Sequence, residues 1–309
     1  MKCPDSKIIC CLGVSLYLLS AVAHAAEVKK DIEYAKPGGV SVKLDACIPD
    51  GPGPFPAAIL VHGGGWSNVT TDKTQEISPM FAPLTKAGIA WFSIDYRLAP
   101  TYRYPACIED LEAAVKWVKA HAKEYNIDPN RIALMGESAG GMMVDMVAAR
   151  ATADKPETRV AAVVAFYAPC DLVADANSKG GAKSSQQQLL GVPAGPINEN
   201  TTKLLHDASP TTYVHKGMPP FLLVHGTADT GVSHDQSVEW QAKMKELGVP
   251  CELISIPDGV HVMGNWEKID PTYKDKVTAW LLKTLNEKKP APAEVKGDKA
   301  ATKTTTSGK

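Results

Sequence analysis

The chain has 309 residues, of which 44% are hydrophobic and 22% are charged, and its formal net charge is −1 at pH 7. This is the composition of a globular protein that can bury a full core, and one large domain is the simplest expectation. A nearly neutral chain lacks the basic field that attracts polyanions, so nucleic acid is excluded as a partner.

The N-terminus has the pattern of a cleavable export signal. Lys2 and Lys7 precede an apolar run over residues 8–22, and the tripeptide at 23–25 has small residues at its first and last positions. The run is shorter than the roughly 20 residues that a membrane-spanning helix needs. We therefore expect residues 1–25 to be a signal peptide and the protein to be secreted or periplasmic, without stable membrane insertion.

Apolar runs alternate with helical patterns along the rest of the chain. Partly alternating residues over 31–48 predict antiparallel edge strands, and the stretches 105–122 and 235–247 have apolar residues at helical spacing. Six runs predict buried strands, at 57–61, 89–94, 131–135, 160–166, 221–224 and 252–256. The alternation predicts an α/β protein with a mostly parallel sheet, helices on both faces, and a site at the carboxyl ends of the strands.

Two segments depart from this alternation. Residues 171–220 form a long stretch that we expect to be irregular, acting as a lid or binding segment or forming a plain surface loop with one helix. Past Asn286 the composition is restricted to residues that cannot build a core, so 287–309 should be a disordered tail. One folded domain is therefore expected over 26–286.

Four cysteines follow the predicted signal peptide: Cys47, Cys107, Cys170 and Cys251. An even number in an oxidising compartment permits disulfides in any of three pairings, but four small buried side chains are an equal alternative. Cysteine and histidine residues show no zinc-type spacing, so we expect neither a metal nor another cofactor.

The strongest local signal lies at residues 136–140, which read Gly-Glu-Ser-Ala-Gly between the predicted strand 131–135 and a helical stretch at 141–150. This is G-x-S-x-G in the strand–turn–helix context of a nucleophile elbow, where glycines permit a tight, strained turn that lifts the serine hydroxyl above the sheet. Ser138 is therefore the predicted nucleophile.

A serine hydroxyl is a weak nucleophile and needs a base within hydrogen-bond reach. His261 lies in the loop after the last predicted strand, which is a carboxyl-end position. His62 and His225 also lie at strand ends, but structural hydrogen bonds suit them better. We predict His261 as the general base.

The base needs a carboxylate on its far ring nitrogen, which in this type of fold falls between nucleophile and base in chain order. Asp229 follows the predicted strand 221–224 and satisfies that order. Asp235 is better suited to start a helix, and Asp258 to form a turn. Asp229 is the predicted orienting acid.

A glycine run follows the predicted strand 57–61, in the sequence His-Gly-Gly-Gly-Trp at residues 62–66. Glycines let the backbone approach a substrate closely, so amides of this run and of Ala139 are expected to bind a developing oxyanion. A phosphate loop is disfavoured because no G-K-[ST] ending follows.

These motifs, with Asp-Tyr-Arg-Leu-Ala-Pro at 95–100 and His-Gly-Thr-Ala-Asp at 225–229, resemble those of hormone-sensitive-lipase-like esterases. They are still more similar to the compact branch of carboxylesterases, feruloyl esterases and acetylxylan esterases. The resemblance covers residues 40–285 and implies the α/β-hydrolase fold, with Gly64 and Gly65 as the oxyanion donors beside Ala139. It also implies a carboxylic ester substrate, either a small molecule or a polysaccharide with acetyl or feruloyl groups.

Lipase-like members carry a long helical cap before the glycine run, whereas the residues before His62 predict strands. We therefore expect an open cleft suited to a bulky ester, unless 171–220 closes it. Trp66, Tyr167 and Met263 are expected pocket walls.

Two other functions fit the same scaffold less well. An amide hydrolase, similar to kynurenine formamidases or prolyl-oligopeptidase-like peptidases, would share the elbow and the order of the catalytic residues. A non-catalytic binding module is disfavoured because such relatives usually lose a catalytic residue, and here all three are present.

Overall fold

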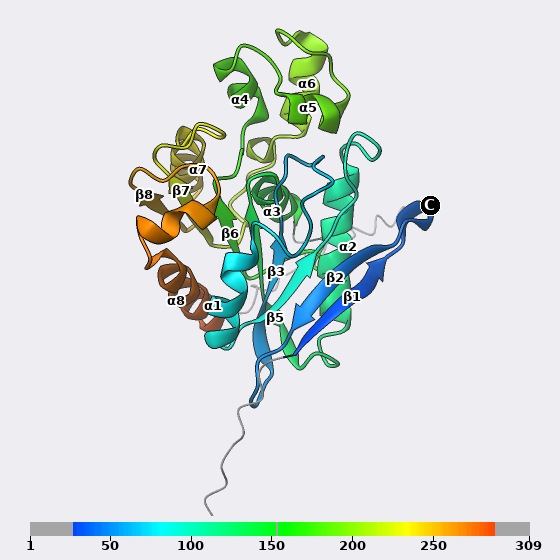
Figure 1. The fold of residues 1–309 in the computed structure, drawn as a ribbon, viewed down its shortest axis with the longest axis vertical. Coiled ribbons are helices and arrows are strands. Elements are labelled where there is room, and N and C mark those ends of the chain that lie inside the picture. Colours follow the sequence, from blue (N-terminus) through cyan, green and yellow to red (C-terminus); the bar gives the residue numbers. More distant parts are fainter. Residues whose placement is uncertain (1–26, 153, 288–309) are drawn as a thin grey trace, which may run out of the picture.

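Eight strands form one sheet in the computed structural model, which describes residues 27–152 and 154–287 (Figure 1). Their order across the sheet is β1-β2-β4-β3-β5-β6-β7-β8. Pairing is antiparallel from β1 through β2 to β4 and parallel elsewhere, as the sequence predicts. The strands are β1 (Val28–Ala35), β2 (Val42–Cys47), β3 (Phe55–Val61), β4 (Ala90–Ile94), β5 (Ile127–Glu137), β6 (Ala162–Phe166), β7 (Phe221–Gly226) and β8 (Cys251–Ile256).

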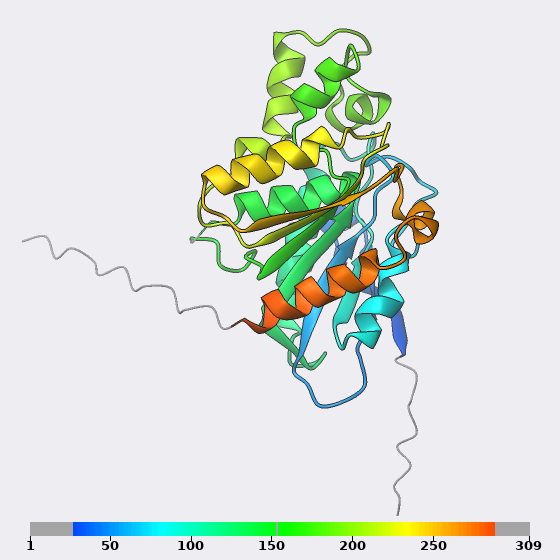
Figure 2. The ribbon, with the colours of Figure 1, turned by 90° about the vertical axis from the view of Figure 1, so that its left-hand side faces the viewer.

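Helices cover both faces of this sheet (Figure 2). Helices α1 (Phe81–Lys86) and α8 (Tyr273–Asn286) share one apolar cluster with one face, while α2 (Ala106–Ala120), α3 (Ala139–Arg150) and α7 (Asp235–Glu246) pack on the other. Central strands are therefore buried on both sides, which explains why they appear in the sequence as continuous apolar runs.

The segment 171–220 is more regular than predicted. It contains α4 (Leu172–Ser178), α5 (Ser184–Leu190) and α6 (Glu199–Asp207), which Figure 1 shows beyond one end of the sheet. Side chains of Asp171 and Asn198 cap α4 and α6 by accepting backbone N–H bonds. The prediction of an irregular loop was wrong because all three helices are short and α5 and α6 are largely polar, so the segment carries little apolar periodicity.

All four cysteines of the described residues are free. Cys170 Sγ donates to the backbone oxygen of Gln236, and Cys47 Sγ lies 3.7 Å from Thr85 Oγ1. The small-buried-side-chain alternative therefore describes this structure best, although Cys251 is only half-buried.

The predicted signal peptide and, apart from Glu287, the predicted tail lie outside the described residues. Within 27–152 and 154–287, no helix combines the length and the apolar character that crossing a bilayer would require.

Candidate active site

Ser138 occupies a sharp turn between β5 and α3. Its backbone has φ 52° and ψ −116°, a conformation that non-glycine residues rarely adopt, and its amide donates to the Phe166 carbonyl at 2.9 Å. Gly140, in the first turn of α3, lies so close to the carbonyls of Val61 and His62 that a Cβ would collide with them. The turn therefore brings the start of α3 against the end of β3.

His261 connects Ser138 to Asp229. The Ser138 hydroxyl donates to His261 Nε2 at 3.0 Å, and His261 Nδ1–H donates to Asp229 Oδ2 at 2.7 Å. The Asp229 side chain is fully buried, whereas 28% of the His261 side chain is exposed. Three residues from the ends of β5, β7 and β8 thus form one hydrogen-bonded chain that ends at a half-buried hydroxyl.

Asp229 is held ionised by its surroundings. Oδ1 accepts the amides of Gly231 and Val232 at 2.7 and 2.9 Å, and Oδ2 also lies 3.3 Å from His225 Nε2. Burial raises the pKa of Asp229, but the hydrogen bonds from His225, His261 and Val232 outweigh burial and keep its pKa well below the usual range. A carboxylate that stays charged can stabilise an imidazolium on His261.

The other two strand-end histidines make structural contacts, as predicted. His225 is fully buried and bonds Ser237 Oγ at 2.8 Å. His62 stacks on Tyr96 with ring centroids 4.5 Å apart, and burial lowers its pKa. No hydrogen bond joins either ring to Ser138 within the described part of the chain.

The glycine run bends back beside Ser138. Gly64, Gly65 and Trp66 all have positive φ, at 84°, 60° and 61°, and the Trp66 indole donates to the Ala139 carbonyl at 3.1 Å. The amide of Ala139 lies in the first turn of α3, where backbone N–H groups have no acceptor within the helix. Gly65 and Ala139 face the same cavity as Ser138, whereas Gly64 is not among its lining residues.

A buried carboxyl supports this loop. Glu137 is fully buried and accepts the amide of Gly63, while the Tyr96 hydroxyl donates to the carbonyls of His62 and Gly63. Burial, reinforced by the nearby Glu76 carboxyl, raises the pKa of Glu137 well above its usual value. The sequence analysis missed this role, although an acid at the end of a buried strand was a signal for it.

The cavity at Ser138 has a volume of about 240 Å³. One wall comes from the elbow and the glycine run, a second wall comes from the helical insertion, and the loops after β6, β7 and β8 complete the lining. Its lining residues are Gly65, Trp66, Ser138, Ala139, Pro169, Asp175, Lys183, Ser185, Gln186, Gly231, Val232 and His261.

Trp66 lines this cavity as predicted, but Tyr167 and Met263 do not. Both side chains are fully buried, and the Tyr167 hydroxyl accepts the Met263 amide at 3.2 Å. The Tyr167 ring packs edge-on against His261 with centroids 4.7 Å apart. Tyr167 therefore supports the His261 ring, and neither Tyr167 nor Met263 forms a wall of the pocket.

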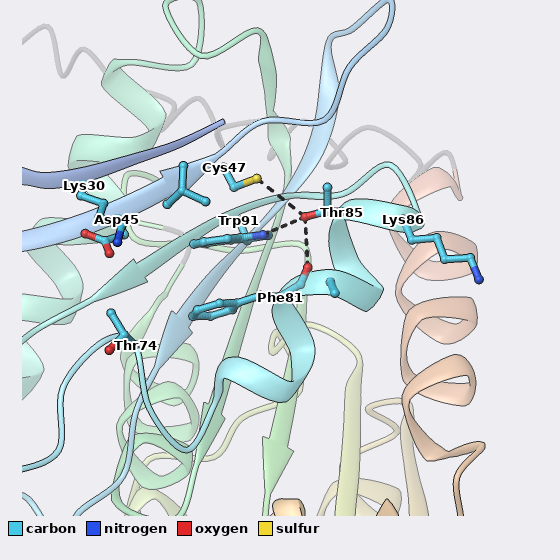
Figure 3. Close-up of a pocket in the computed structure, with 10 residues that line it drawn as sticks. Lys30, Asp45, Cys47, Thr74, Phe81, Thr85, Lys86 and Trp91 are labelled. Atoms are coloured by element: carbon cyan, nitrogen blue, oxygen red, sulfur yellow. Dashed lines mark hydrogen bonds between the residues drawn. The ribbon is translucent and has the colours of Figure 1, made fainter. Parts of the chain in front are cut away.

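A larger cavity, of about 610 Å³, lies between β1, β2 and α1 (Figure 3). Phe81 and Trp91 stack there with centroids 4.2 Å apart, and the thiol of Cys47, whose pKa burial raises, lies beside Thr85. Its lining residues include no histidine that could activate the thiol. The smaller cavity is therefore the better candidate for an active site.

Residues that could hold a metal ion do not cluster in the described part of the chain, where no group of three or more histidine, cysteine, aspartate or glutamate side chains has a suitable arrangement.

The strand order, the strained serine after β5 and the His–Asp pair at the ends of β8 and β7 define an α/β-hydrolase. More particularly, the chain belongs to the BD-FAE family, whose model matches residues 44–244. This membership confirms the resemblance to compact, hormone-sensitive-lipase-like hydrolases.

Curated relatives include two proteins of Mycobacterium tuberculosis. The probable carboxylic ester hydrolase LipM is 31% identical over 63% of this chain and 46% of its own length. The carboxylesterase NlhH is 30% identical over 70% of this chain and 69% of its own length. The chain thus spans about half to two thirds of the length of these relatives.

Among solved structures, a truncated carbohydrate esterase from gut microbiota superposes with a TM-score of 0.74. It is 26% identical, and the match covers 86% of this chain and 99% of that one.

Proposed function

We propose that this protein is a serine carboxylic-ester hydrolase that acts through Ser138, His261 and Asp229 on esters with a short acyl group, including acyl groups carried by polysaccharides. The hydrogen-bonded chain from the Ser138 hydroxyl to the Asp229 carboxylate supports the proposal most directly. Each distance falls within the reach that proton transfer to a base requires.

In the proposed reaction, Ser138 Oγ attacks the ester carbonyl while His261 Nε2 takes the hydroxyl proton. The amides of Gly64 or Gly65 and of Ala139 stabilise the oxyanion, and one such donor is typically worth about 2.7 to 4 kcal/mol. His261 then returns the proton to the leaving alcohol, and the same residues activate water to release the acid.

The size of the cavity supports a short acyl group. Its volume of about 240 Å³ is below the roughly 300 to 1,000 Å³ of sites that enclose a whole drug-sized ligand. The reacting ester and a small acyl group fit such a space, whereas the rest of a large substrate must lie outside it. The names of LipM, NlhH and the carbohydrate esterase point to the same chemistry.

Hydrolysis of p-nitrophenyl acetate, butyrate and octanoate by the purified protein tests the proposal, with acetylated xylan and methyl ferulate as natural-type substrates. We expect p-nitrophenyl acetate to be hydrolysed faster than p-nitrophenyl octanoate. The substitution Ser138→Ala should lower kcat by about 10⁴-fold or more. Equal activity of wild type and the variant would overturn the assignment of Ser138. Faster turnover of p-nitroacetanilide than of p-nitrophenyl acetate would favour the amidase alternative.

A further inference from the structure

An open trough lies beside the Ser138 cavity and shares Lys183 and Gly231 with it. Its volume is about 600 Å³, within the range of ligand-binding sites. We name it the lysine trough, and its lining residues are Lys179, Gly180, Gly181, Ala182, Lys183, Ser184, Gly195, Thr230 and Gly231. A substrate that reacts at Ser138 and is too large for the first cavity can extend into this trough.

The charge of the lysine trough has one sign. None of its lining residues is acidic, and two are lysines. Lys183 Nζ is neutralised by the buried Asp175 carboxylate at 2.7 Å. Lys179 forms no ion pair with any residue that the structure describes, and its Nζ donates to the Thr230 carbonyl at 3.3 Å. One uncompensated positive charge therefore remains in the trough.

Both ammonium groups are held in place by backbone carbonyls of the loop that carries Asp229. Lys183 also donates to the Gly231 carbonyl at 2.6 Å, so two of its three protons are used and one remains. Lys179 uses one proton and keeps two. The free donors thus lie beside the Ser138 cavity, and a carboxylate is one of the anionic groups that accept charge-assisted hydrogen bonds from such donors.

We propose that the lysine trough binds the alcohol portion of the substrate and selects a saccharide chain that carries carboxylates, such as a uronate polymer bearing acyl esters. This inference rests on the proposed function, because only an ester hydrolase would place the acylated hydroxyl at Ser138. Glycines along the trough leave room for sugar rings, and the lysines supply the charge contacts.

The test compares two substrates that differ only at their carboxyl groups: acetylated galacturonan oligosaccharides with free carboxylates, and the same oligosaccharides with the carboxyls converted to uncharged methyl esters. Acetate release is measured, so that any hydrolysis of the methyl ester is not counted. We expect kcat/KM to favour the charged polymer by about tenfold at low salt, and the preference to shrink at high salt because exposed charges are screened.

Matched lysine variants locate the effect. Lys179→Gln should reduce the preference for the charged polymer by about threefold to fivefold, the size expected for one exposed ion pair. Lys203→Gln makes the same charge change on α6 of the same insertion, outside the trough, and should leave the preference unchanged. A structural defect would lower kcat/KM on both polymers by the same factor and leave the ratio of the two values as in wild type.

The outcomes separate this inference from the proposed function. Equal kcat/KM on the two polymers, with p-nitrophenyl acetate still hydrolysed, overturns the trough inference and leaves the esterase standing. An equal loss of preference in Lys179→Gln and Lys203→Gln assigns the effect to net charge and also overturns it. Absence of hydrolysis of every ester, p-nitrophenyl acetate included, overturns the proposed function itself.

Discussion

The two walls of the Ser138 cavity are built in different ways. The wall made by the elbow and the glycine run is held by backbone geometry, with positive φ at Ser138 and Gly65 and the Gly63 amide bonded to a buried carboxyl. The wall made by the insertion is held by side chains, chiefly the contacts that Lys183 and Gln186 make to Asp175. Side chains can be exchanged without rebuilding the backbone, so the second wall can change substrate preference while the first preserves the chemistry.

The largest effect expected on the first wall comes from Asp229→Asn. Loss of the carboxylate removes the group that orients His261 and fixes its tautomer, so kcat on p-nitrophenyl acetate should fall by about 10⁴-fold. Asp258→Asn is the matched control, since Asp258 lies in an exposed turn three residues from His261. Near-normal kcat in Asp229→Asn would show that another group performs the orienting role.

Gly65→Ala tests whether the two walls meet. The alanine would have to adopt φ 60°, and its Cβ would lie 3.0 Å from Ser185 Cβ. Displaced oxyanion donors should lower kcat/KM by about 10²-fold to 10³-fold. Gly88→Ala imposes a similar φ of 71° in open space and should reduce stability without that loss. If Ser185→Gly restores part of the activity of Gly65→Ala, the steric conflict with the insertion is established.

Glu137→Gln probes the support beneath the glycine run. Unfolded glutamate titrates near pH 4.3, but folded Glu137 has a raised pKa and keeps its proton to higher pH. Between these two pKa values the folded state binds more protons than the unfolded state, so the free energy of unfolding of the wild type falls as pH rises. Glutamine does not titrate, so the variant lacks this loss of stability. The free energy of unfolding of the variant relative to wild type should therefore increase with pH.

Urea denaturation at about pH 5 and about pH 8 measures that difference. The exposed Glu124→Gln serves as the control and should show no such trend. A stability difference that stays constant between the two pH values would contradict the raised pKa of Glu137.

The smallest effect is expected from Ser185→Ala on the insertion wall. Ser185 lines the cavity, and no hydrogen bond to its hydroxyl is found among the described residues. Its removal should change the free energy of unfolding by less than about 0.5 kcal/mol and raise KM for p-nitrophenyl acetate by at most about threefold, with kcat nearly constant. A tenfold or larger drop in kcat would show that a residue of the insertion takes part in the reaction, and the proposed difference between the two walls would be wrong.

The sequence predicted the first wall much better than the second. All six apolar runs became strands. The five that lie inside the sheet are buried on both faces and need continuous apolar residues, whereas β8 is a partly exposed edge strand. Ser138, His261 and Asp229 come together because each follows a strand of one sheet, and parallel strands end at one edge. These features follow from the sheet topology, which the order of apolar runs and motifs along the sequence reveals.

The remaining features depend on side-chain direction and on contacts distant in sequence. Tyr167 and Met263 were predicted on the pocket wall, but both side chains are buried in the core, where the Met263 amide and the His261 ring hold Tyr167 in place. The contact between Asp175 in α4 and Lys183 just before α5 joins two short segments that are too short to leave a periodic signal. Neither property is encoded in residue spacing.

The close approach of Gly140 to the end of β3 has a dynamic consequence. Because the backbone of α3 rests directly on the carbonyls of Val61 and His62, the serine and the glycine run are carried by one rigid unit. A change in the position of the insertion therefore need not alter the distances between Ser138 Oγ and the amides of Gly65 and Ala139. In the proposed reaction, substrate entry past the insertion and bond breaking at Ser138 can therefore be governed by separate parts of the molecule.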